Sequence, residues 1–255
     1  MQLLLFLIVY PILLLLSIVP FRFLYILSDI VYFFVYRIFG YRKKVVRENL
    51  ALALPHLSIA ERLIIEKKSY KHLCDMFLEM IKTMGISKKE MDKRFVFKNL
   101  EVYKSLEKDG KSIALLLSHY ASYEWVISMN SEISFKGFAV YKKVNNKYFD
   151  RLVRKIRSKF DTELVPINKI AEVIASNNSN NIKSVYGFVS DQSPQLKAKN
   201  YWHNFMGIEV PVYVGTEMLS KKIDMNVVFL KVSKVRRGYY EAEFEILSTN
   251  VKEIP

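Results

Sequence analysis

The stretch that decides the fold is Ser112-Ile-Ala-Leu-Leu-Leu-Ser-His-Tyr-Ala-Ser-Tyr-Glu-Trp125. Its first part, residues 112–118, is a continuous apolar run of strand length. A strand that is covered on both faces of a parallel sheet has this composition, whereas a half-exposed strand alternates apolar and polar residues. We therefore predict a buried parallel strand that ends near His119.

Similar short runs occur later in the chain, and helical patterns separate most of them. They are Gly137–Tyr141, Glu163–Pro166, Ser184–Ser190 and Asn226–Ser233. Arg237-Gly238 indicates a turn into an antiparallel hairpin strand, Tyr239–Leu247, at the sheet edge. Strands that alternate with helices predict an α/β fold with a mixed, mostly parallel sheet flanked by helices.

Upstream, helix signals are clear. Ser58 and Glu61 form a capping box, and the helical pattern that follows runs to Gly85. Shorter helices are expected at 43–54, from Ser87, and from about Val102 to Gly110.

The first 21 residues contain no charged side chain, which predicts an N-terminal membrane-anchor helix. A second apolar stretch, 23–39, is interrupted by Asp29 and Arg37, and we favour an interfacial helix over a second span or a re-entrant piece. The basic cluster that begins at Arg42 predicts that the following domain faces the cytoplasm. The expected division is residues 1–40 as anchor and interfacial segment and 41–255 as the catalytic domain.

The chain carries 39 basic and 25 acidic side chains, a net charge of +14. Such an excess attracts anionic lipid, nucleic acid or an acidic protein. The apolar leader beside the basic region favours the membrane reading, and no nucleic-acid partner is expected. The one cysteine, Cys74, lies in an apolar helical pattern and is read as a core residue.

His119 and Glu124 are the candidate catalytic residues. Sites in open α/β sheets form at the carboxyl ends of strands, so an imidazole at this strand end and a carboxylate at the next helix start can meet. The carboxylate would fix the tautomer of a general base. His56 and Glu61 have the same spacing, but no strand precedes them and Glu61 belongs to the capping box.

Further polar residues follow the other strands. The helix 147–160 combines an apolar stripe with a basic face, which either is simply solvated or binds phosphate or an acidic protein. Asp191 and Gln192 follow the strand Ser184–Ser190, where a Ser-Pro turn is the plain alternative. The candidate substrate-binding residues are Tyr141, Lys142, Arg154, Arg157, Asp191 and Gln192.

Five blocks in order resemble the bacterial lipid A biosynthesis acyltransferases, the late lauroyl/myristoyl acyltransferases of the lysophospholipid acyltransferase superfamily. The family's His-x-x-x-x-Asp/Glu block reads His119-Tyr-Ala-Ser-Tyr-Glu124-Trp here. The other blocks are Tyr41–Leu50, Val140 to Arg157, Asp191-Gln192, and Phe205 to Glu217. Lys142 stands where the family commonly has Arg, and Ala121-Ser122 replaces its usual Gly-Asn.

The resemblance implies a glycerol-phosphate-acyltransferase-like fold and a bacterial inner-membrane enzyme. It implies a fatty acyl donor on acyl carrier protein and a hydroxyl of a lipid A precursor as acceptor. His119 would be the general base, oriented by Glu124, with no cofactor and no metal. Two alternatives stay open: an O-acyltransferase on an amino-acid-containing lipid or a lysophospholipid, and a basic, membrane-tethered protein that only binds anionic lipid.

Overall fold

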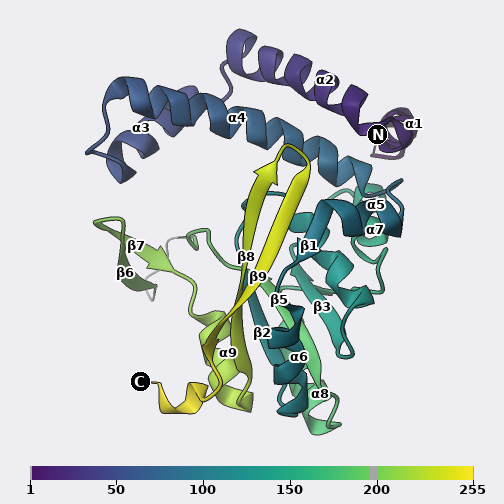
Figure 1. Ribbon diagram of the computed structural model, residues 1–255, viewed down its shortest axis with the longest axis vertical. Coiled ribbons are helices and arrows are strands. Elements are labelled where there is room, and N and C mark those ends of the chain that lie inside the picture. Colours follow the sequence, from purple (N-terminus) through teal and green to yellow (C-terminus); the bar gives the residue numbers. More distant parts are fainter. Residues whose placement is uncertain (1, 196–199, 255) are drawn as a thin grey trace.

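Strand β2 (Ile113–Leu117) lies inside a seven-stranded sheet, in the computed structural model that describes residues 2–195 and 200–254 (Figure 1). Its neighbours are β5 (Ser184–Val189) and β8 (Asn226–Arg236), and both pair with it in parallel. Ile113 and Leu115 pack into a core with helices α2 (Phe21–Tyr32), α4 (Ile59–Lys82), α5 (Lys88–Arg94) and α6 (Leu100–Lys108). Ala114 packs into a second core with helix α8 (Ile170–Ser179). The continuous apolar run of the sequence is therefore a strand covered on both faces.

The strand order is β1-β9-β8-β2-β5-β3-β4, and all neighbours pair in parallel except β8 and β9. The remaining strands of this sheet are β1 (Phe95–Phe97), β3 (Lys136–Tyr141), β4 (Glu163–Pro166) and β9 (Tyr239–Ser248). The mixed, mostly parallel sheet predicted from the sequence is confirmed. One detail was wrong: β9 is not at the edge, because the three-residue strand β1 pairs along its outer side.

The helices after residue 58 also follow the sequence signals. They are α4 (Ile59–Lys82), α5 (Lys88–Arg94), α6 (Leu100–Lys108), α7 (Lys147–Arg157), α8 (Ile170–Ser179) and α9 (Gly215–Ile223). Both halves of the capping box at Ser58 and Glu61 are present. A short 3-10 helix, Val251–Glu253, lies near the end of the chain.

The chain begins with α1 (Gln2–Ile18), α2 (Phe21–Tyr32), a π-helical turn (Phe33–Ile38) and α3 (Lys43–Ala53). Helices α2 and α4 lie side by side above the sheet (Figure 1). Lys82 donates to the carbonyls of Ser17 and Val19, each at 2.7 Å, and so caps the end of α1 with a cation, where the helix dipole is negative.

Most apolar side chains of α1 are exposed, with Leu4, Ile8 and Leu15 each 60% or more exposed. Among the described residues, no single helix is both long and apolar enough to span a bilayer. Phe21–Ile38 and Lys43–Ala53, bent by 88°, pass the length and composition test only as a pair. The anchor in residues 1–21 stays a prediction, and Met1 lies outside the described residues.

A small two-stranded sheet, β6 (Tyr201–Phe205) and β7 (Ile208–Val212), extends from the main body (Figure 1). The sequence analysis did not predict it. All five residues of β6 are exposed, including His203, so no burial pattern marks the strand.

Candidate active site

The register of two parallel strands brings His119 and Asp191 together. Leu117 at the end of β2 is paired with Val189 at the end of β5. The chain continues for two residues beyond this pair on both strands, to His119 on one and to Asp191 on the other. Parallel strands end at the same edge of a sheet, so the two side chains meet there.

Asp191 holds His119 at two points. Its Oδ1 lies 2.6 Å from the imidazole Nδ1, and its Oδ2 accepts the backbone N–H of His119 at 2.9 Å. Because a carboxylate on Nδ1 favours the tautomer with the proton there, the Nε2 lone pair is left to accept a proton. The ring of Tyr123 meets the imidazole edge-on, with 4.9 Å between the ring centres, and burial raises the pKa of Tyr123 to about 12.

The structure gives Glu124 a different partner from the one expected. Arg157 Nε donates to Glu124 Oε2 at 2.7 Å, and Arg157 Nη2 donates to Oε1. Burial opposes the guanidinium charge, but the hydrogen bonds and attraction of Glu124 outweigh it and raise the pKa of Arg157. Among the described side chains, Asp191 rather than Glu124 therefore orients the imidazole.

The local backbone explains the exchange of partners. Ala121 is buried and adopts a left-handed conformation with a φ of 57°, so the chain turns sharply after β2. The expected helix follows, as a 3-10 helix, Tyr123–Ser131. Glu124 is carried on this helix to the last turn of α7, where Arg157 lies.

His119, Glu124 and Arg157 line one cavity of about 760 Å³. Most of its wall is apolar and comes from β2, β3, β5, α8, α9 and the 3-10 helix, for example Leu115, Val126, Phe138, Ile170 and Leu219. Pockets that take apolar ligands have this composition, with a few polar groups that fix the orientation. The imidazole of His119 thus lies in the wall of an apolar cavity.

The candidate substrate-binding residues fall into three groups. Tyr141, Lys142, Arg157 and Gln192 line the cavity with His119 and Glu124. Asp191 acts on His119 directly. Arg154 is exposed on α7 and is not among the cavity-lining residues of the described chain.

Lys159 and Cys74, two residues considered in the sequence, have structural roles. Lys159, counted in the basic face, donates to the carbonyls of Thr83, Met84 and Ile86 and closes the end of α4. Cys74 is buried, as expected of a core residue.

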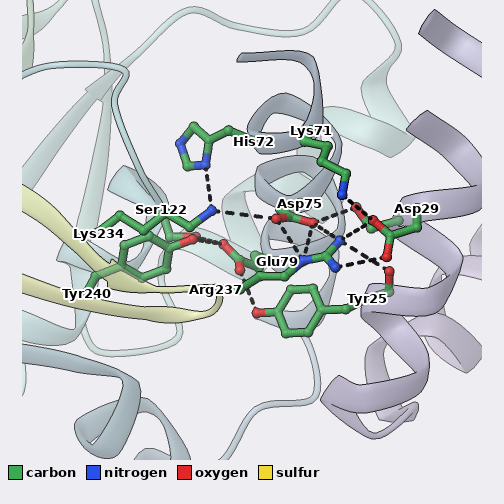
Figure 2. Close-up of polar contacts among 11 residues, drawn as sticks. Tyr25, Asp29, Lys71, His72, Asp75, Glu79, Ser122, Lys234, Arg237 and Tyr240 are labelled. Atoms are coloured by element: carbon green, nitrogen blue, oxygen red, sulfur yellow. Dashed lines mark hydrogen bonds and ion pairs between the residues drawn. The ribbon is translucent and has the colours of Figure 1, made fainter. Parts of the chain in front are cut away.

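A buried polar network, drawn in Figure 2, was not predicted from the sequence. Glu79 on α4 is fully buried and accepts from the hydroxyls of Tyr25 at 2.6 Å, Tyr240 at 2.7 Å, and Ser122. Three elements, α2, α4 and β9, are thereby joined to the loop that carries His119. The available signal was a set of acidic residues, Glu66, Asp75 and Glu79, within the apolar pattern of helix α4.

A second part of the network surrounds Arg237, in the turn between β8 and β9. Arg237 pairs with Asp75 of α4 and with Asp29 of α2, and Ser28 donates to Asp75 at 2.7 Å. Asp29, which interrupts the apolar segment 23–39, thus has its partner more than 200 residues away. Gly238 follows with a φ of 75°, and a side chain there would collide with the Tyr25 hydroxyl.

We expect the stability of the protein to depend on the ionisation of Glu79. Burial raises the pKa of its carboxyl, so the folded state binds this proton more tightly than the unfolded state. The resulting stabilisation is full below the ordinary carboxyl pKa of about 4.3 and is lost as the pH rises towards the raised value. The stability of Glu79→Gln should not decline in this way. Urea unfolding from pH 4.5 to 8 measures the free energy of unfolding of both proteins. If it changed equally with pH in the two, Glu79 would not be the responsible group.

We expect Glu124→Gln to destabilise the fold through Arg157. Glu124 is 7% exposed and Arg157 23%, so the substitution leaves a mostly buried cation without its counter-charge. The expected loss is about 2 kcal/mol, or a fall in the melting temperature of about 4–8 °C. Glu132→Gln is the matched control, because Glu132 pairs with Lys88 at the exposed surface and should change stability by less than about 1 kcal/mol. Equal melting temperatures for both variants would contradict the prediction.

Comparison with known families gives one match. The family model described as bacterial lipid A biosynthesis acyltransferase matches residues 2–246. No curated protein matches the chain significantly. The matched range contains His119, Glu124, Arg157 and Asp191, together with all the residues that line the cavity.

Proposed function

Because the chain belongs to the bacterial lipid A biosynthesis acyltransferase family, and is therefore an acyltransferase with a lipid acceptor, we propose its reaction as follows. It transfers a fatty acyl chain from an acyl carrier protein thioester to a hydroxyl of a lipid A precursor. The observation that carries this proposal is the imidazole of His119, held by Asp191 in the wall of an apolar cavity of about 760 Å³.

In the proposed mechanism His119 is the general base. Its Nε2 takes the proton from the acceptor hydroxyl, and the oxygen attacks the thioester carbonyl carbon. Asp191 stabilises the imidazolium that results. The tetrahedral intermediate then collapses, the carbon–sulfur bond breaks, and the thiolate takes the proton from the imidazolium. The ester forms without a covalent enzyme intermediate.

The apolar cavity suits the acyl chain, because each methylene buried there contributes about 0.8 kcal/mol to binding. Lys142 and Arg157 are the two permanently cationic residues in its lining. A fixed positive charge favours the negative oxygen of the tetrahedral intermediate. We assign these two residues to the polar end of the acyl site.

The remaining features support a donor on an acidic carrier and a location at the inner membrane. Arg151, Arg154 and Lys155 are exposed on α7 and offer a basic surface to an acidic protein. The exposed apolar face of α1 suits contact with a bilayer interior, and the basic residues from Arg42 to Arg47 suit its cytoplasmic surface. We place the catalytic domain on the cytoplasmic side of the bacterial inner membrane.

Transfer assays with the purified full chain test this proposal. Each assay pairs one donor, a lauroyl or myristoyl carrier-protein thioester, with one acceptor: a lipid A precursor, a lysophospholipid or an amino-acid-containing lipid. Mass spectrometry of the products should show the acyl gain on the lipid A precursor at the highest kcat/KM. A higher kcat/KM on either other acceptor would overturn the assignment of the acceptor but not that of the chemistry.

A further inference from the structure

A second cavity, of about 690 Å³, also reaches His119. It lies between helix α4 and the turn of the β8–β9 hairpin, and His119 lines it as well as the apolar cavity. Its other polar lining residues are Lys68, Ser69, Lys71, His72, Asp75, Tyr120, Lys234 and Arg237. The same imidazole therefore faces an apolar space and a charged one.

The second cavity has an excess of positive charge. Four cations and one carboxylate, Asp75, belong to its lining. Asp29, which does not line the cavity itself, pairs with the lining residues Lys71 and Arg237. When both carboxylates are counted against the four cations, two positive charges remain.

Lys68 is the cation best placed to meet a ligand. It is exposed, and among residues 2–195 and 200–254 no carboxylate pairs with it. Lys71, by comparison, lies 3.7 Å from Asp29, and Lys234 lies 3.6 Å from Asp75. Lys68, Lys71, His72 and Asp75 follow the helical spacing and so share one face of α4.

His72 lines the cavity beside Lys234. Lys234 Nζ lies 3.3 Å from His72 Nδ1, and because an ammonium group only donates, Nδ1 accepts and the proton belongs to Nε2. Burial and the nearby Lys234 lower the pKa of His72, which favours this neutral form. The Nε2 atom is buried and has no hydrogen-bond partner among the described residues.

We propose that this cavity binds a phosphomonoester on the headgroup of the acceptor lipid, so that the acceptor hydroxyl reaches His119 from the charged cavity while the acyl chain occupies the apolar one. The inference rests on the proposed function, since it names the acceptor's chemistry. A phosphomonoester carries a charge of about −1.5 to −2 at pH 7, which matches the excess of four cations over two carboxylates. A neutral headgroup would leave this excess charge uncompensated.

The test compares two neighbouring lysines of α4. Lys68→Gln removes a cavity cation, and Lys67→Gln removes the same charge from an exposed lysine outside the cavity lining. Binding of the full chain is measured to detergent micelles that contain phosphatidic acid, a phosphomonoester lipid. Micelles with phosphatidylglycerol, a phosphodiester, and with uncharged diacylglycerol are the controls.

Lys68→Gln should weaken binding to phosphatidic acid micelles by about fivefold, and Lys67→Gln by less than about twofold. Neither variant should differ from the wild type on diacylglycerol micelles. An equal loss for the two variants, or an equal loss on phosphatidylglycerol, would overturn the site, because it would indicate general attraction to anionic surfaces.

Transfer kinetics distinguish a phosphate on the acceptor lipid from the phosphodiester of the carrier-protein donor. They also separate the proposed anion site from the proposed function. Lys68→Gln should raise the KM for a phosphorylated acceptor and leave the KM for the carrier-protein donor unchanged. A rise in the donor KM alone would assign the cavity to the carrier's phosphodiester and overturn the inference. If binding falls as expected but the wild type transfers no acyl chain to any acceptor, the proposed function fails and the anion site stands.

Discussion

Replacing His119 with alanine is expected to lower the rate of acyl transfer by about 10³-fold or more. The substitution removes the only group that the mechanism assigns to take the hydroxyl proton, and general-base catalysis is worth about 10²- to 10⁴-fold. His119 is 34% exposed, and among the described residues its side chain hydrogen-bonds to Asp191 alone, so the fold should survive the loss. Steady-state transfer to the lipid acceptor measures the effect.

His203→Ala is the matched control for this prediction. His203 is an exposed histidine on β6 and lies outside both cavities. It should retain full activity, and both variants should melt like the wild type. If His119→Ala kept more than about a tenth of the activity, His119 would not be the general base.

The second large effect concerns Asp191. We expect Asp191→Asn to reduce kcat by about 10²- to 10³-fold, because the amide cannot offset the imidazolium charge and can hold the wrong imidazole tautomer. The backbone N–H of His119 keeps an oxygen acceptor in this variant, so the loop should stay in place. Rates at saturating concentrations of both substrates measure kcat.

Glu124→Gln separates this account from the one that the sequence suggested. Since Glu124 holds Arg157 rather than His119, its loss should lower stability and reduce kcat less than Asp191→Asn does. If Glu124→Gln reduced kcat more than Asp191→Asn, the carboxylate five residues after the histidine would be the orienting group after all.

Much of the fold could be predicted because one property, burial on both faces, shapes each central strand. The apolar runs around Ile113, Ser184 and Asn226 give the three central strands of the sheet, since a strand between two helical layers has no polar face. The short strand β1 and the hairpin β6–β7 escaped prediction. Three residues are too few to show a period, and β6 buries none of its residues.

The site could be predicted in part. Its residues were found because polar side chains at strand ends stand out after apolar runs, as at His119 and Asp191. The pairing was wrong, because the spacing of His119 and Glu124 along the chain says nothing about the register between β2 and β5. That register, which only the folded sheet defines, decides which carboxylate meets the imidazole.

The charged cavity could not be read from the sequence either. Its cations come from α4 and, more than 160 residues later, from β8 and the turn that follows it, and their proximity depends on the pairing of Arg237 with Asp29 and Asp75. A single-sequence pattern carries no signal for contacts at that separation.

Mass spectrometry of lipid A tests the central claim most directly. Lipid A is compared among bacterial cells that carry the gene for this chain, cells that lack it, and deletion cells complemented with wild type or His119→Ala. We predict lipid A lighter by one acyl chain in the deletion and in the His119→Ala cells, with the mass restored by the wild type. Unchanged lipid A in the deletion, or restoration by His119→Ala, would contradict the account.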